Sequence, residues 1–160
     1  MAGCDLLLDN IDFLFRDTET IEKLLKKYLE KIIFISKSPF GALYAVNKAG
    51  IRERKLKLLK KIGNFDAPNF ISSDNDLFYF FNISREFVVL TERKDSPFST
   101  VLLNEEVNAG IGIPFFLKGS IYSVIILNFI DKENLNFGIM ENVEKFNKLI
   151  AVMQNRLNLK

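Results

Sequence analysis

The sequence predicts an α/β (α+β) domain whose central strands are covered on both faces. Apolar side chains occupy both alternating sets of positions between residues 121 and 130, so neither face of that strand suits water. Residues 40–47 repeat this two-sided apolar pattern. Apolar residues at helical spacing between 136 and 157 then predict a long helix, which supplies one covering layer.

A β-hairpin is expected over residues 109–130. Ile111, Ile113 and Phe115 alternate with other residues, as in a strand. Gly119 then interrupts the pattern where a tight turn favours glycine. The hairpin leads into the long helix, whose apolar stripe suits packing on a sheet or contact with a second copy of the chain. The stripe is formed by Ile139, Val143, Phe146, Ile150, Met153 and Leu157.

The rest of the chain alternates between helical and strand patterns. Residues 1–17 predict a short, apolar N-terminal helical extension. A helix follows from 18 to about Phe34, with Asp17 or Thr18 as its N-cap. The later elements are a strand over 40–47, a basic strand over 54–62, a loop over 63–73, a short helix ending at Phe81 before a break at Asn82, a strand over 86–91 and a short helix over 97–103.

Composition places the chain among ordinary globular proteins. Its 160 residues suit one domain, with 48% hydrophobic and 26% charged residues. No apolar run reaches the roughly 20 residues of a membrane-spanning helix. The acidic N-terminus, with Asp5 and Asp9, lacks the basic region of a signal peptide, and Cys4 is the only cysteine. We therefore expect a cytoplasmic protein without membrane insertion.

The sequence lacks the residues that several kinds of catalytic and metal site require. Histidine is absent, which removes the commonest general base and metal ligand. A single cysteine excludes a cysteine-based zinc or iron–sulfur site. Gly110 and Gly112 are not followed by the helix and lysine of a phosphate-binding loop. We therefore expect no catalytic residues, no metal site and no cofactor, and a protein that is not an enzyme.

The strand over 54–62 carries much of the positive charge. Lys55 and Lys57 alternate with leucines, which is typical of solvent-facing lysines on an edge strand. Together with Arg52 and Arg54 they would also suit a phosphate-binding patch. Aromatic residues that would stack on bases are not interleaved, which disfavours a nucleic-acid partner.

Two segments resemble the strands of a GAF domain. The run Ala109-Gly110-Ile111-Gly112-Ile113-Pro114-Phe115, with Gly119 and residues 122–127, is similar to the paired last strands of that family. Residues 38–44 resemble its first strand, and the resemblance covers 18–157. It implies a GAF-like three-layer α/β/α domain at 18–158 with a central antiparallel sheet of about five to six strands. The first and last helices would cover one face, and residues 66–108 would cover a pocket on the other.

The resemblance also implies a function. GAF domains mostly sense small molecules, pass the signal to an attached output domain and often dimerise through their terminal helices. We therefore expect a small-molecule-sensing regulatory domain with an unknown ligand, and a homodimer through the terminal helices. A ligandless dimerisation module is the alternative, and nucleic-acid binding by the basic strand is a third. An ion pair between Lys132 and Glu141 would fix the corner before the last helix.

This sequence lacks the residues that other branches of the family require. Bilin-attaching members need a cysteine near the chromophore, haem-binding members need histidine, and methionine-sulfoxide-reducing members need pocket cysteines. Cys4 lies outside the matched region.

The cover over 66–108 is rich in phenylalanine, which would either fill the space against the sheet or wall a pocket. If there is a pocket, we expect Arg85 to bind an anionic group of the ligand. The other candidate ligand-binding residues are Ser73, Asp74, Ser99, Thr100, Asn108 and Ser123.

Overall fold

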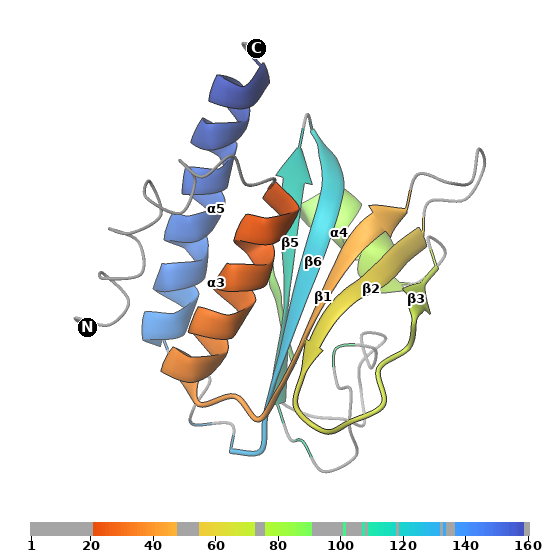
Figure 1. The fold of residues 1–160 in the computed structure, drawn as a ribbon, viewed down its shortest axis with the longest axis vertical. Coiled ribbons are helices and arrows are strands. Elements are labelled where there is room, and N and C mark those ends of the chain that lie inside the picture. The colour runs from red at the N-terminus through yellow and green to blue at the C-terminus, as the bar shows by residue number, and fades with distance from the viewer. Residues whose placement is uncertain are drawn as a thin grey trace.

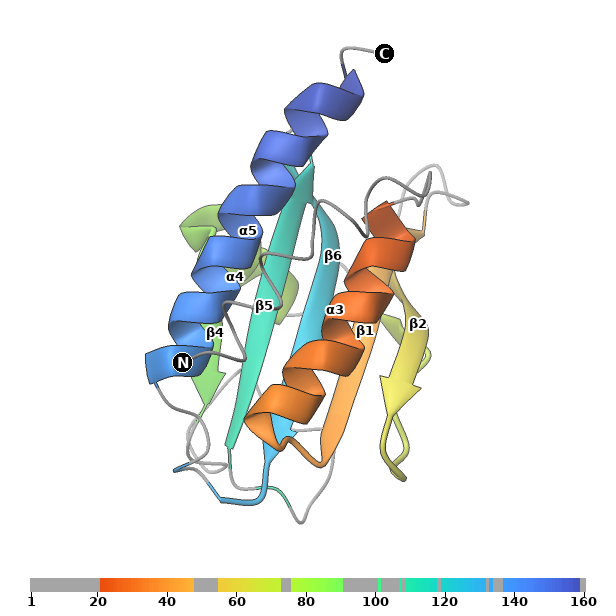
Figure 2. The same cartoon turned by 60° about the vertical axis from the view of Figure 1, so that its left-hand side comes forward.

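The chain forms an antiparallel sheet with helices on both of its faces (Figures 1 and 2). The structure is a computed structural model that describes residues 21–47, 55–72, 76–90, 101, 107, 109–117, 119–131, 133 and 137–158. Its six strands have the order β3-β2-β1-β6-β5-β4. The elements are α3 (Ile21–Ser36), β1 (Phe40–Asn47), β2 (Lys55–Ile62), β3 (Phe70–Ile71), α4 (Asp76–Ser84), β4 (Val88–Leu90), β5 (Ala109–Leu117), β6 (Ser120–Phe129) and α5 (Phe137–Asn158).

The layers agree with the three-layer prediction. Helices α3 and α5 lie side by side on one face of the sheet, and α4 lies on the other (Figures 1 and 2). Leu43 and Ile125 point into the core beneath α3 and α5, whereas Tyr44 and Val124 point into the core beneath α4. All four side chains are fully buried. The central strands β1 and β6 are therefore apolar on both faces because a separate core covers each face.

The hairpin and the final helix were well predicted. Strands β5 and β6 pair from Ala109 opposite Phe129 to Leu117 opposite Ser120. Gly119 in the turn has φ +78°, the left-handed conformation that glycine adopts without strain. Helix α5 then runs within one residue of its expected bounds.

The end of α4 differs from the prediction. The expected break at Asn82 is wrong, because the helix continues to Ser84. The side chain of Asn82 is exposed, so water can solvate its amide without interrupting the backbone ladder. The helix ends instead at Arg85, which has φ +59° and donates its backbone N–H to the carbonyl of Phe81 at 3.1 Å. This is the left-handed termination that closes many helices.

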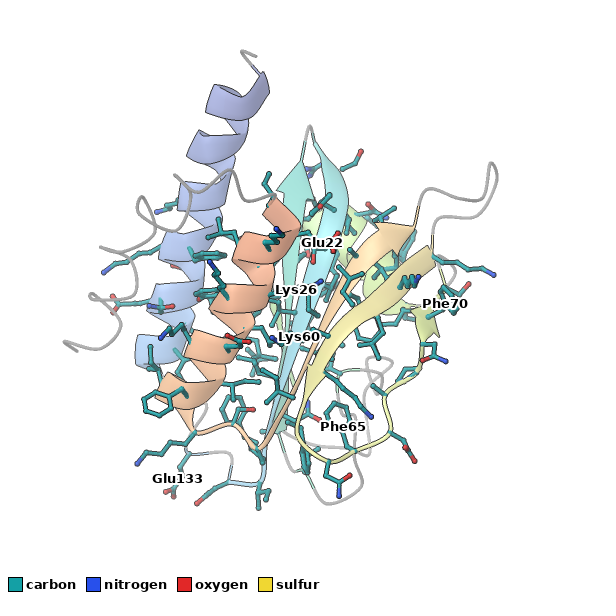
Figure 3. The ribbon with its side chains drawn as sticks, viewed as in Figure 1. Glu22, Lys26, Lys60, Phe65, Phe70 and Glu133 are labelled. Carbon is teal, nitrogen blue, oxygen red and sulfur yellow. The ribbon has the colours of Figure 1, made fainter. Side chains whose placement is uncertain are left out.

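The lysines of β2 had suggested an edge strand. The structure shows that β2 is not the outermost strand along its whole length. The short strand β3 pairs with its first half, placing Phe70 opposite Lys57. Phe70 marks this edge of the sheet, far from α5 (Figure 3). Lys55 and Lys57 are nevertheless exposed, as predicted. A strand of two residues has no alternation to detect, which is why the loop prediction for 63–73 missed it.

Some predictions lie outside the described residues. They concern the N-terminal extension over 1–17, most of the short helix over 97–103 and the Lys132–Glu141 ion pair. The helices in the described ranges include none with the length and apolarity needed to cross a bilayer.

Candidate functional site

The sheet face beneath α4 is the candidate site, because the pocket was expected there. Small residues lie at its centre: Ala42 on β1 is fully buried, and Gly112 lies on β5. A Cβ atom added to Gly112 would lie 3.2 Å from Cζ of Phe81 and 3.3 Å from Cγ2 of Val101. Among the described residues, these apolar side chains therefore occupy the space above the glycine.

Two buried polar side chains on this face hold the segments that cover it. The hydroxyl of Tyr44 donates to the carbonyl of Pro68 at 2.8 Å, and burial raises the pKa of Tyr44 well above its usual value. The side-chain amide of Asn128 donates to the carbonyl of Val101 at 2.6 Å. Both side chains are fully buried, so each bond lies in an apolar surrounding where losing it is costly.

Sequence reasoning missed Tyr44 and Asn128 as site residues. Each lies within an apolar strand, and only the pairing of β1 with β6 reveals that both point towards α4. The alternation of apolar residues along β6 would have placed Asn128 on the same face as Val124 and Ile126. It could not have identified Val101 as its partner, 27 residues away.

Arg85, predicted to bind an anionic ligand, contacts the protein instead. Its guanidinium donates to the carbonyl of Gly119 at 2.7 Å and lies over the ring of Phe116, 5.0 Å from the ring centroid. The side chain therefore joins the end of α4 to the turn between β5 and β6. It is exposed, and a guanidinium carries five N–H donors, so donors remain for a further partner.

Ser123, the other described candidate, has a structural contact. It is fully buried, and its hydroxyl donates to the carbonyl of Tyr44 at 2.5 Å. This bond lies inside the ladder between β1 and β6. The remaining candidates lie outside the described residues: Ser73, Asp74, Ser99, Thr100 and Asn108.

Two lysines of the basic strand have partners within the domain. Lys60 forms an ion pair with Glu30 of α3, and Figure 3 shows Lys60 extending towards that helix. Lys61 donates to the carbonyl of Phe65 at 2.9 Å. The ion pair of Lys60 reduces the charge that β2 offers to a phosphate backbone, whereas Lys61 keeps its positive charge. Among the residues that the structure describes, no three carboxylate, histidine or cysteine side chains are grouped to hold a metal ion.

An open pocket lies on a different side of the molecule, between α5 and the connection from α4 to β4. Its volume is about 390 Å³. Its lining residues are Arg85, Glu86, Phe87, Glu144, Asn147 and Lys148.

No protein family model and no curated protein sequence matches the chain. Solved structures do match it. A phycoerythrobilin-bound GAF domain from a cyanobacterial phytochrome has a TM-score of 0.75 at 10% identity, covering 99% of each chain. The A. aeolicus nlh2 GAF domain in an inactive state has a TM-score of 0.64 at 16% identity, covering 99% of this chain and 97% of that one.

A third match corrects the expectation that the chain is not an enzyme. The free methionine-R-sulfoxide reductase from Neisseria meningitidis has a TM-score of 0.68 at 15% identity, covering 94% of this chain and 89% of the reductase. The absence of histidine and the presence of a single cysteine excluded particular mechanisms, but they did not exclude a fold that enzymes use. The chain has a GAF-like fold, which GAF domains and free methionine-R-sulfoxide reductases share.

Proposed function

We propose that this chain is a regulatory domain that binds a small molecule between the sheet and α4. The observation that carries the proposal is the layer above Gly112. Phe81 and Val101 rest on a glycine, and the hydrogen bonds of Tyr44 and Asn128 hold the covering segments in place. A GAF domain with a similar fold is bound to phycoerythrobilin, which supports the binding of a small molecule but does not specify its location.

The ligand would take the place of side chains in this layer. The face is mostly apolar, with few polar groups, which is the usual composition of a small-molecule site. A ligand that displaces the ring of Phe81 would gain apolar contacts with Ala42 and Gly112. It would also reach the hydroxyl of Tyr44 or the amide of Asn128, so we expect an apolar molecule with one or two hydrogen-bonding groups.

The signal would pass from α4 to α5 through the hairpin. Arg85 joins the end of α4 to the turn after β5. The opposite face of β5 carries Phe115, whose ring meets the ring of Phe146 in α5 at 5.7 Å and 88°. A displacement of α4 would therefore be transmitted to α5 through one hairpin. From α5 it would be transmitted to an output domain or a partner.

The proposed partner is a second copy of the chain, joined through the terminal helices. Phe34 of α3 supports this, because 83% of this large apolar side chain is exposed. The C-terminal end of α5 also extends beyond the sheet, where a neighbouring helix could pack (Figure 1).

A thermal-shift screen against nucleotides, cyclic nucleotides and small carboxylates tests the proposal. A ligand at 100 times its dissociation constant adds about 2.7 kcal/mol to the free energy of unfolding. Gly112→Val would fill the site and abolish the shift, whereas Glu141→Gln, on the exposed side of α5, would keep it. A shift that survives Gly112→Val would contradict binding beneath α4.

A ligandless dimerisation module is the second candidate. It is favoured by the side chains of Leu77, Phe81 and Val101, which occupy the space above Gly112. Sedimentation at micromolar concentration distinguishes the two: a dimer that forms without any ligand-induced thermal shift favours this candidate, and a strict monomer excludes it.

A further inference from the structure

The pocket beside α5 brings together charges of both signs. Two of its lining residues are acidic, Glu86 and Glu144, and two are basic, Arg85 and Lys148. Asn147 adds an amide, and Phe87 adds a ring that is partly buried against the core beneath α3 and α5. The pocket is separate from the layer beneath α4, because α5 covers the opposite face of the sheet (Figure 2).

The charged groups of this pocket do not neutralise one another. Glu144 and Lys148 are four residues apart on α5, in the order that favours an ion pair. Glu22 and Lys26 of α3 have the same spacing and order, and they pair at 3.3 Å (Figure 3). Within the ranges that the structure describes, Glu86, Glu144 and Lys148 belong to no ion pair. Their charges are therefore available to a ligand.

We propose that this pocket binds a small zwitterion of the α-amino acid type. Its ammonium group would lie against Glu144 and Glu86, and its carboxylate against Lys148 and the remaining donors of Arg85. A side chain of the ligand would cover the ring of Phe87. A ligand with a single charge would meet a repulsive group as well as an attractive one. The volume of about 390 Å³ is within the range of small-molecule sites.

Such a ligand would connect two elements that both line this pocket. It would bridge the connection after α4, through Arg85 and Glu86, to the middle of α5. Occupancy would restrain the helix that leads out of the domain. This inference goes beyond the proposed function, because it requires no ligand beneath α4.

An NMR titration of the ¹⁵N-labelled protein tests the proposal with three probes. L-leucine carries both charges, N-acetyl-L-leucine lacks the ammonium group, and L-leucinamide lacks the carboxylate. We expect saturable shifts with L-leucine at the amides of residues 85–87 and 144–148. Each analogue should bind about tenfold more weakly, because it loses one charged hydrogen bond.

Variants identify the residues responsible. Glu144→Gln and Lys148→Gln should each weaken L-leucine binding about tenfold for the same reason. Their matched controls, Glu141→Gln and Lys31→Gln, remove exposed charges outside the pocket and should leave the affinity unchanged.

Two results would overturn the inference: no saturable shift with L-leucine, or equal affinity for all three probes. Shifts centred on Phe81 and Gly112 would also overturn it, while supporting a ligand beneath α4. The location of the shifts therefore distinguishes failure of this inference from failure of the proposed function.

Discussion

The ring of Tyr28 in α3 lies flat against the ring of Phe146 in α5. The ring centroids are 3.6 Å apart and the planes differ by 2°. The hydroxyl of Tyr28 also donates to the side-chain oxygen of Asn142, one turn earlier in α5, at 2.7 Å. All three side chains are buried, so this contact fixes the two helices of one layer against each other.

Removing the ring of Phe146 should strongly destabilise the domain. Phe146→Ala loses the contact with Tyr28 and the edge contact with Phe115, and we expect a cost of about 3–5 kcal/mol. Tyr28→Phe keeps the ring but loses the hydrogen bond to Asn142, and we expect it to lower the free energy of unfolding by about 0.5–1.5 kcal/mol. Urea unfolding measures both as a lower midpoint at constant slope. Tyr79→Ala is the control, because this exposed ring should change the free energy of unfolding by less than about 0.5 kcal/mol.

The two glycines of β5 should differ in their tolerance of a side chain. A Cβ at Gly110 would lie 3.0 Å from the backbone carbonyl oxygen of Val101, whereas a Cβ at Gly112 would lie 3.2 Å from the end of the Phe81 side chain. A ring can rotate away more easily than the backbone can move. We expect Gly110→Ala to cost about 1–3 kcal/mol by overpacking, and Gly112→Ala to cost less than about 1 kcal/mol.

Thermal unfolding of the two alanine variants provides the comparison. Equal melting temperatures would contradict the close packing of the Val101 carbonyl against β5.

The parts of the fold that follow from local patterns were predictable. The bounds of β1 match the prediction because Pro39 opposes helix just before it and both of its faces are apolar. The end of α4 was missed, since it depends on a left-handed backbone at Arg85, which no apolar pattern reports. Strand β3 was missed because pairing with β2 alone defines it.

The candidate site was less predictable than the fold. Charge identified Arg85, but its contacts are with Gly119, 34 residues later, and with the ring of Phe116. Ser123 was also a candidate, yet the partner of its hydroxyl is a backbone carbonyl on a neighbouring strand. Contacts between distant segments decide whether a polar side chain binds a ligand or completes the fold, and a single sequence does not contain them.

Tyr44 should make stability depend on pH in the alkaline range. Burial raises the pKa of Tyr44 in the folded state above its ordinary value of about 10. The contribution of the Tyr44 proton to the free energy of unfolding is therefore fully present below about pH 10. It is lost as the pH rises above that value, by about 1.4 kcal/mol per pH unit. Tyr44→Phe removes this dependence, together with the bond to Pro68.

Urea unfolding of the wild type and of Tyr44→Phe between pH 8 and about pH 11 measures the effect. The advantage of the wild type should shrink as the pH rises, because Tyr44 ionises in the unfolded chain first. Lysines that titrate in this range are common to both proteins, so they cancel in the difference. Tyr79→Phe, which changes an exposed tyrosine, is the matched control. A difference that stays constant with pH would contradict the raised pKa.

Arg85 combines an unfavourable backbone with favourable side-chain contacts, and two substitutions separate them. At φ +59°, alanine retains the backbone strain and loses the guanidinium contacts with Gly119 and Phe116. Glycine loses the same contacts but relieves the strain. We therefore expect Arg85→Gly to be more stable than Arg85→Ala by about 1 kcal/mol, with the wild type close to the glycine variant. If chemical denaturation instead ranks alanine above glycine, α4 does not end in a left-handed residue, and the connection from α4 to the β5–β6 turn needs another explanation.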